Sequence, residues 1–196
     1  MTENEKFNII NINNYFSNEY IKNKSKVFDN FNCPLNNDVE YFLKNNAIEF
    51  AKKNQSVTYL VFTREEKLLA GYFSLAIKPV SLNALNFSKS FLRVIQRTSK
   101  LDSCNQTYNL SAYLIAQLGK NFTYNDITGN ELLGLALSKL QNIQKEIGGT
   151  VAFVETDNNN KLLDFYQSNN FKPFNTRLTD STSSKPKELV QLIRKI

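Results

Sequence analysis

One strand–loop–helix segment carries the strongest candidate for chemistry in this sequence. Residues 112–118 (AYLIAQL) read as a buried strand, and a polar loop leads from it to Thr128 and Glu131, which stand in the spacing of a helix-capping box. Helix N-terminal amides point outward and carry partial positive charge, so this turn would bind an anion such as a pyrophosphate. Gly129 has no Cβ, which would let a phosphate approach the amides of Thr128, Gly129 and Asn130 closely. The alternative is an ordinary strand–helix turn that Thr128 caps for stability alone.

Composition excludes several other kinds of chemistry. The chain has 196 residues and no His, so it has no imidazole base, no Ser-His or Cys-His nucleophile pair and no His-containing zinc site. Two cysteines, Cys33 and Cys104, are too few for a thiolate metal cage or a disulfide framework, so we expect no metal and a cytoplasmic protein. No apolar run approaches the ~20 residues of a membrane helix, and residues 1–6 do not have the form of a signal peptide. The net charge of +6 suits a polyanionic partner or an anionic cofactor.

Hydrophobic spacing predicts the elements that must position the strand–loop–helix segment. Apolar runs predict strands at residues 6–12, 57–62, 68–77, 112–118, 150–155, 171–174 and 188–196. Apolar residues at intervals of three or four predict helices at residues 37–53, 87–101, 128–147 and 158–168. A Ser/Thr/Lys loop at residues 179–187 would precede the last strand. With no internal repeat and no linker, this order predicts a single domain over residues 1–196, an α/β (α+β) sheet with helices on both faces.

A few residues predict where these elements begin and end. Glu40 lies three residues after Asn37, in capping-box register at the start of a helix. Pro79 should stop the second strand of a hairpin, because proline lacks an amide hydrogen. Gly148 and Gly149 should end the long helix, and Asn169-Asn170 should form a left-handed stop after the last one.

A second charged feature lies on the helix predicted at residues 87–101. Lys89, Arg93, Arg97 and Lys100 recur every three or four residues, so they would share one helix face that could follow a nucleic-acid backbone. A face that is merely solvated is the alternative. No aromatic residue interleaves this stripe, so base stacking is not indicated.

Three segments of the C-terminal half resemble the GNAT superfamily of acyl-CoA-dependent N-acetyltransferases. They are AYLIAQLGKNF (112–122), ITGNELLGLAL (127–137) and GGTVAFVETDNNNKLLDFYQSNNFKPF (148–174). The third is the most specific, since Asn159, followed by Phe165-Tyr166 and Asn170-Phe171, is similar to the family's Asn-x-x-Ala-x-x-x-Tyr and Gly-Phe pattern. Residues 31–62 resemble a narrower branch that includes toxin-type acetyltransferases acting on aminoacyl-tRNA.

The resemblance implies a fold and a cofactor site. The fold would be a mixed, mainly antiparallel sheet with a central splay, and the cofactor would be acetyl-CoA. Its pantetheine would pair with the strand at Leu118, Gly119 and Lys120, its pyrophosphate would bind the amides of residues 128–130, and Asn159 would contact it. A glycine that ends a strand and an asparagine that caps a helix are the alternatives for Gly119 and Asn159.

The resemblance also implies a catalytic residue, Tyr166. Amine attack on a thioester expels a thiolate, and a phenol within hydrogen-bond reach can protonate or stabilise it. A tyrosine of the core is the alternative for this residue. The base stays unassigned: Glu155 is a candidate, and a backbone carbonyl with water, or an amine that arrives neutral, would also serve.

Two functions follow from these residues. The first is an N-acetyltransferase acting on a primary amine, with aminoacyl-tRNA, a protein or a small amine as acceptor, and with a homodimer and an antitoxin protein as candidate partners. The second is a binding module on the same scaffold that works through a protein or RNA surface. It is favoured by two departures from the family's phosphate loop, Tyr124 and Ile127.

Overall fold

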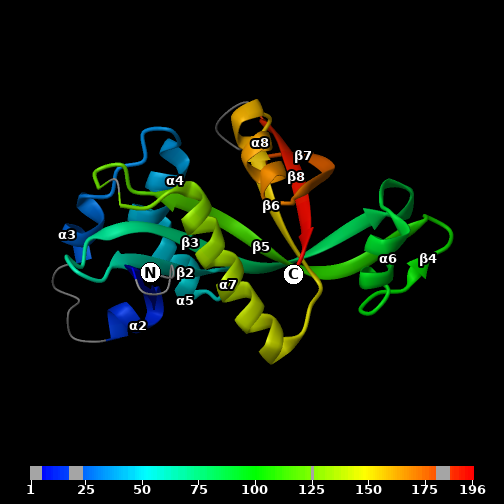
Figure 1. Cartoon of the computed structure of the whole chain (residues 1–196), viewed down its shortest axis with the longest axis horizontal. Coiled ribbons are helices and arrows are strands. Elements are labelled where there is room, and N and C mark those ends of the chain that lie inside the picture. The colour runs from blue at the N-terminus through cyan, green and yellow to red at the C-terminus, as the bar shows by residue number, and fades with distance from the viewer. Residues whose placement is uncertain (1–5, 18–23, 125, 180–185) are drawn as a thin grey trace. The chain divides into compact units, whose positions relative to one another are not determined.

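A computed structural model describes residues 6–17, 24–124, 126–179 and 186–196 (Figure 1). Residues 1–5, most of the segment compared above with a signal peptide, and residues 180–185 of the predicted Ser/Thr/Lys loop lie outside the described residues. The chain divides into two compact units, which we describe separately. Unit 1 comprises residues 1–76 and 116–139, and unit 2 comprises residues 77–115 and 140–196. The single domain stays a prediction.

As predicted, the strands form a mixed, mainly antiparallel sheet, which has eight strands in the described residues. Their order is β1-β2-β3-β5-β6-β8-β7, and β4 pairs with β5. The strands are β1 (Phe7–Asn11), β2 (Val57–Thr63), β3 (Leu69–Asn83), β4 (Leu101–Asp102), β5 (Thr107–Lys120), β6 (Val151–Asp157), β7 (Lys172–Leu178) and β8 (Glu188–Lys195). The β5–β6 pair is parallel, with Tyr113 opposite Ala152 and Leu114 opposite Phe153. The apolar run at residues 112–118 is therefore part of a central strand, as its two nonpolar faces predict.

Unit 1 contains the predicted edge strand β1, the hairpin of β2 with β3, and most of the N-terminal helices. These helices are α2 (Ile12–Ser17), α3 (Lys24–Asp29), α4 (Asn37–Tyr41), the π-helical turn η2 (Phe42–Asn46) and α5 (Ala47–Lys52). Apolar side chains spaced along the 37–52 helical stretch, such as Leu43 and Ala47, are buried in the core, which explains the predicted helix.

The predicted capping box at Asn37 and Glu40 is wrong. Asn36 is the N-cap, and its side chain accepts from the amides of Asp38 and Val39. The Glu40 carboxylate instead accepts from the amide of Cys33 at 2.8 Å and pairs with Lys44 at 2.7 Å. Asn36, one residue earlier, caps the helix because its side chain reaches the amides of the first turn directly.

Unit 2 contains the second part of β3, then η3 (Ala84–Asn86), α6 (Lys89–Ile95) and β4, and later α8 (Asn160–Ser168) with β6, β8 and β7. Figure 1 shows the last three strands side by side, with α8 next to β6. The prediction that Pro79 stops its strand is wrong, since β3 continues to Asn83. Pro79 lies in an exposed stretch of β3, where its φ suits an extended chain and a missing amide hydrogen is tolerated.

The helix predicted at residues 87–101 is shorter than expected. It ends at Ile95, where the buried apolar positions Phe91 and Ile95 also end. Residues 101–102 pair instead with Tyr108 and Thr107 as a short strand. The long helix α7 (Gly129–Ile147) does end at Gly148 and Gly149, which have φ of +79° and +106°.

Candidate active site

The anion-binding turn predicted in unit 1 is present at the start of α7. Thr128 Oγ1 accepts from the Glu131 amide, and the Glu131 carboxylate accepts from the Thr128 amide and hydroxyl, so the capping box is confirmed. Lys6 Nζ lies 3.6 Å from the other Glu131 oxygen. The hydrogen bond from the Thr128 amide holds the pKa of Glu131 below its usual value, and the Thr128 hydroxyl and Lys6 add to this effect against the cost of desolvation. The amide of Gly129 is not used by this box.

Ile127, one of the departures from the family's loop pattern, turns away from the surface. Its side chain is 1% exposed, whereas Thr128 and Asn130 are exposed and Gly129 is half-buried. The β-branched side chain is therefore part of the core and is not exposed beside the first turn. The other departure, Tyr124, is half-buried.

Asn121, at the end of β5, fixes the loop that leads to α7 and was missed by the sequence reasoning. It is fully buried, and its side chain accepts from the amides of Asn32 and Thr123 at 3.0 Å each. It also donates to the carbonyls of Leu69 at 2.8 Å and Asn30 at 3.3 Å. This side chain joins the start of the loop to a segment about ninety residues earlier, and a lone asparagine in the sequence gives no signal of that role.

The strand segment expected to pair with pantetheine occupies the end of β5. A Cβ at Gly119 would lie 2.6 Å from both Tyr72 Cε1 and Val39 Cγ1. Gly119 thus allows the close approach of the Tyr72 and Val39 side chains. Leu118 is half-buried, and the Lys120 ammonium lies 5.2 Å from the centre of the Phe122 ring.

Tyr166 lies on α8 in unit 2 with its ring packed between two other aromatic rings. Its centroid is 5.0 Å from that of Phe165 and 5.7 Å from that of Phe171, both in edge-to-face geometry. The residue is 9% exposed, and burial raises the pKa of Tyr166 to about 12. Among the described residues, the Tyr166 hydroxyl has no hydrogen-bond partner.

Asn159 serves as the N-cap of α8. Its Oδ1 accepts from the amide of Lys161 at 2.9 Å, and its carbonyl accepts from the amide of Leu163. The capping alternative for Asn159 is therefore confirmed, while a cofactor contact by Asn159 stays a prediction. This cap sets the direction of the helix that carries Tyr166.

Glu155, the candidate base, is held by an arginine and a glutamine. Arg177 Nε and Nη2 donate to its two oxygens at 2.7 and 2.6 Å, and Gln191 Nε2 donates at 2.7 Å. Partial burial acts to raise the pKa of Glu155, but the hydrogen bonds from Arg177 and Gln191 and the charges of Arg177 and Lys78 together lower it. Three donated hydrogen bonds and a lowered pKa make Glu155 poorly suited to accept a proton from an amine.

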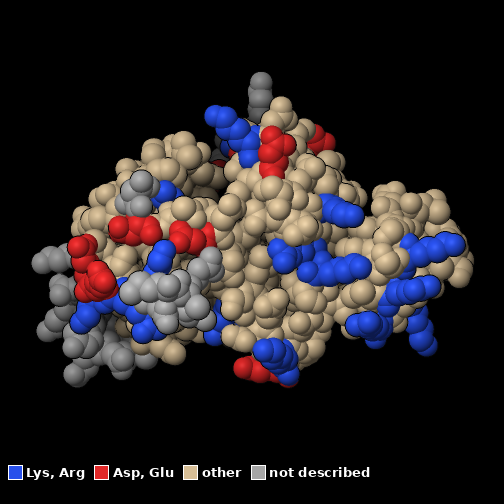
Figure 2. All heavy atoms as spheres, viewed as in Figure 1, with Lys and Arg blue, Asp and Glu red and all other residues tan. Residues whose placement is uncertain are grey.

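The basic residues predicted to form a stripe on one helix are arranged differently in the structure. Lys89 and Arg93 lie on α6, whereas Arg97 and Lys100 follow its end, so the prediction that all four share one helix face is wrong. All four are exposed, and none forms an ion pair among the described residues. Figure 2 shows lysines and arginines, with no acidic side chain in view, over the part of unit 2 that carries α6 and β4. We call these four residues the α6 basic cluster.

The described residues contain no group of three or more His, Cys, Asp or Glu side chains able to hold a metal ion. None of the helices in the described ranges is long and apolar enough to cross a membrane.

The mixed, mainly antiparallel sheet with interspersed helices is a GNAT-like fold. Among solved structures, the chain is similar over nearly its whole length to GNAT toxins. AtaT complexed with acetyl-methionyl-tRNAfMet matches with 16% identity, 96% of this chain, 94% of that chain and a TM-score of 0.66. A Tyr-to-Phe variant of KacT matches with 17% identity, 97% and 95% coverage and a TM-score of 0.66.

A third match is a Tyr-to-Phe variant of AtaT bound to acetyl-CoA and to the C-terminus of the antitoxin AtaR, with 15% identity, 97% and 93% coverage and a TM-score of 0.62. Neither a protein family nor a curated protein matches the sequence. At these identities the likeness shows the fold, which is the fold that the sequence predicts.

Proposed function

We propose that the chain is an acyl-CoA-dependent N-acetyltransferase that transfers an acetyl group from acetyl-CoA to the primary amine of an aminoacyl-tRNA. The observation that carries this proposal is the likeness of the fold, over nearly the whole chain, to a structure holding acetyl-methionyl-tRNAfMet and to one holding acetyl-CoA. The residues of each unit support it separately.

Unit 1 supplies the groups for the acyl donor. The first turn of α7 fits a pyrophosphate, because the Gly129 amide is not used by the capping box and the Ile127 side chain is buried. The negative charge of Glu131 is already matched by the Thr128 amide and Lys6, which reduces its repulsion of a phosphate. Leu118, Gly119 and Lys120 would present the backbone of β5 to the pantetheine. Asn159 stays a candidate contact of the cofactor.

Tyr166 supplies a hydrogen-bond donor for the leaving group. Acetyl-CoA, when bound, provides a thioester whose carbonyl carbon a neutral amine can attack, with loss of the carbon–sulfur bond. A phenol of pKa about 12 is protonated throughout the neutral range, whereas a thiol has an ordinary pKa of about 8.5. Tyr166 therefore stabilises the departing thiolate by donating a hydrogen bond, and the proton that completes the thiol comes in the end from the amine nitrogen.

No base is assigned, because the carboxylate of Glu155 is held by Arg177 and Gln191. An acceptor amine that arrives neutral needs only a positioned water to take its proton after attack. Proximity of the amine to the thioester would then supply much of the rate.

The proposals for the acceptor and the partners rest on the similar solved structures and on the charge of exposed residues. The α6 basic cluster, exposed and without ion pairs among the described residues, suits the phosphates of an RNA. An antitoxin is proposed as a partner because an AtaT variant binds the C-terminus of AtaR. A homodimer and a cytoplasmic location stay predictions.

Titration calorimetry of the full chain with acetyl-CoA, followed by incubation with radiolabelled acetyl-CoA and a pool of aminoacyl-tRNA, tests the proposal. We expect binding and label in the RNA fraction. Label only in added small amines or proteins would keep the transferase and remove the RNA acceptor. No binding at the highest soluble concentration of acetyl-CoA would overturn the transferase and favour the binding module, which the Tyr124 departure supports.

A further inference from the structure

We propose that Arg194, on β8, is a positioning residue for the hydroxyl of Tyr166, acting through Asn169 and Phe171. The inference rests on the proposed role of Tyr166 and goes beyond it, because it says how the hydroxyl is held in place. All the contacts that carry it lie inside unit 2.

Tyr166 is held in place by contacts of its aromatic ring. Its hydroxyl makes no hydrogen bond in the described part of the chain, so no polar contact there sets its position. The ring is located instead by the edges of Phe165, its neighbour on α8, and Phe171, which follows the helix. Phe171 is the contact from outside the helix, and it is 1% exposed.

A turn at the C-terminus of α8 links Phe171 to Tyr166. The Tyr166 carbonyl accepts from the amides of Asn169 at 3.1 Å and Phe171 at 3.0 Å, and Asn170 between them has φ of +64°. This turn folds the chain back so that the Phe171 ring meets the Tyr166 ring. A change in this turn would therefore alter how the Phe171 ring meets the Tyr166 ring.

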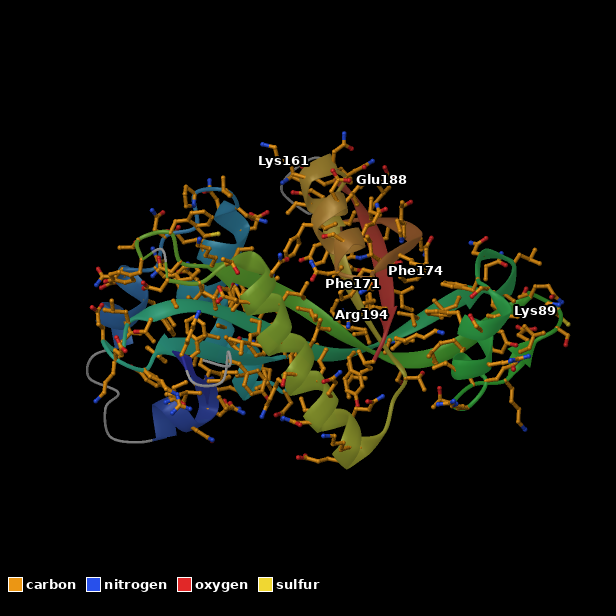
Figure 3. The ribbon with its side chains drawn as sticks, in the orientation of Figure 1. Lys89, Lys161, Phe171, Phe174, Glu188 and Arg194 are labelled. Atoms are coloured by element: carbon orange, nitrogen blue, oxygen red, sulfur yellow. The ribbon has the colours of Figure 1, made fainter. Side chains whose placement is uncertain are left out.

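Arg194 contacts both this turn and the Phe171 ring. Its Nη1 donates to the Asn169 carbonyl at 2.8 Å, and its guanidinium lies 5.9 Å from the centre of the Phe171 ring. Figure 3 shows Arg194 and Phe171 next to each other near β8. A cation at a helix C-terminus is also favoured by the macrodipole. One side chain on a paired strand, with Arg194 opposite Ala152 of β6, thus fixes both the turn and the ring that locate Tyr166.

Replacing Arg194 with Met keeps the long apolar stem and removes the donor and the charge. We expect Arg194→Met to lower kcat by ~10-fold with the KM for acetyl-CoA changed less than about two-fold, because a small misplacement of a catalytic group is costly while cofactor contacts are untouched. In a Tyr166→Phe background the same change should lower kcat by less than about two-fold, since the hydroxyl to be positioned is gone. Arg194→Lys, which keeps a donor and a charge, should restore part of kcat.

A readout independent of activity uses 3-fluorotyrosine placed at position 166 of the full chain. Its fluorine resonance should shift or broaden in Arg194→Met and not in Arg177→Met, a matched control in which an arginine paired with Glu155 is lost. If Tyr166→Phe keeps full activity, the proposed role of Tyr166 fails whatever Arg194 does. If Tyr166→Phe is impaired but the Arg194→Met loss is undiminished in that background, or the resonance does not respond, the positioning role is overturned.

Discussion

Thr128 and Glu131 satisfy each other's backbone amides at the first turn of α7. Thr128 Oγ1 accepts from the Glu131 amide at 3.2 Å, and Glu131 Oε2 accepts from the Thr128 amide at 2.8 Å. The carboxylate of Glu131 thereby occupies the electropositive end of a 19-residue helix, where an anion is stabilised. The same end is the proposed pyrophosphate site. The capping box that stabilises the helix and the proposed cofactor site therefore use neighbouring amides.

The pH dependence of stability should report this arrangement. Because the fold lowers the pKa of Glu131, its contribution is present above the ordinary value of 4.5 and is lost as the pH falls through the lowered value. Glu131→Gln should therefore be less stable than the parent at pH 7, by about 0.3–1 kcal/mol, and the difference should shrink on acidification below about pH 5. Urea unfolding over this range measures it.

The matched control for that experiment is Glu146→Gln, on the last turns of the same helix. A carboxylate near a helix C-terminus faces the negative end of the macrodipole, so this variant should lose no stability at neutral pH. Equal losses in the two variants would show that the capping box is not the cause.

The second prediction concerns the acyl donor. Gly129→Val adds a branched side chain at the first residue of α7, where the proposed phosphate meets the backbone. We expect the affinity for acetyl-CoA, measured by calorimetry, to fall at least ~10-fold, or about 1.4 kcal/mol. Ser138→Val introduces the same side chain at an exposed position of the same helix, away from its first turn, and should bind normally. A folded Gly129→Val variant with unchanged affinity would remove this site.

Periodic patterns and capping residues were sufficient to predict most of the elements. Leu132, Leu133 and Ala136 on α7 are all buried, as the spacing of three and four residues requires. The end of α7 at Gly148 and the left-handed conformation of Asn170 could also be predicted from the sequence, because each residue type suits a positive φ.

Features that depend on contacts distant in sequence were not predictable. The extension of β3 past Pro79 and the short strand β4 follow from pairing with other strands, which overrides local signals. In the candidate site, Asn121 is buried by a segment near Asn30 that no pattern connects to it. Arg194 likewise acts through contacts with the end of α8 that appear only in the folded chain.

The third prediction concerns Tyr166. Tyr166→Phe keeps the ring and its contacts with Phe165 and Phe171 and removes only the hydroxyl, so we expect kcat to fall ~10²-fold with little change in affinity for acetyl-CoA. Steady-state kinetics and calorimetry on the same preparation separate the two effects. Undiminished turnover would make Tyr166 a residue of the core alone.

Alkaline unfolding gives an independent check on the burial of this phenol. Because folding raises the pKa of Tyr166 from 10.0 to about 12, its contribution to stability is complete below pH 10 and is lost as the pH rises toward 12. The free energy of unfolding should therefore fall less steeply between pH 10 and 12 in Tyr166→Phe than in the parent. Tyr41→Phe, at a residue 60% exposed, should leave the slope unchanged.

The last prediction concerns the acceptor and the α6 basic cluster. Arg93→Glu with Arg97→Glu reverses two exposed charges of the cluster, and the double change should weaken binding to aminoacyl-tRNA because fewer counterions are released from the RNA. The parent's affinity should fall steeply with salt, and the double variant's less steeply. Lys53→Glu with Lys145→Glu makes the same change in net charge at exposed positions outside the cluster, so it separates a local contact from a general effect of charge. Filter binding to charged tRNA at two salt concentrations decides between them: equal losses in both double variants would remove the cluster as a binding surface, and no parent binding at low salt would remove the RNA acceptor itself.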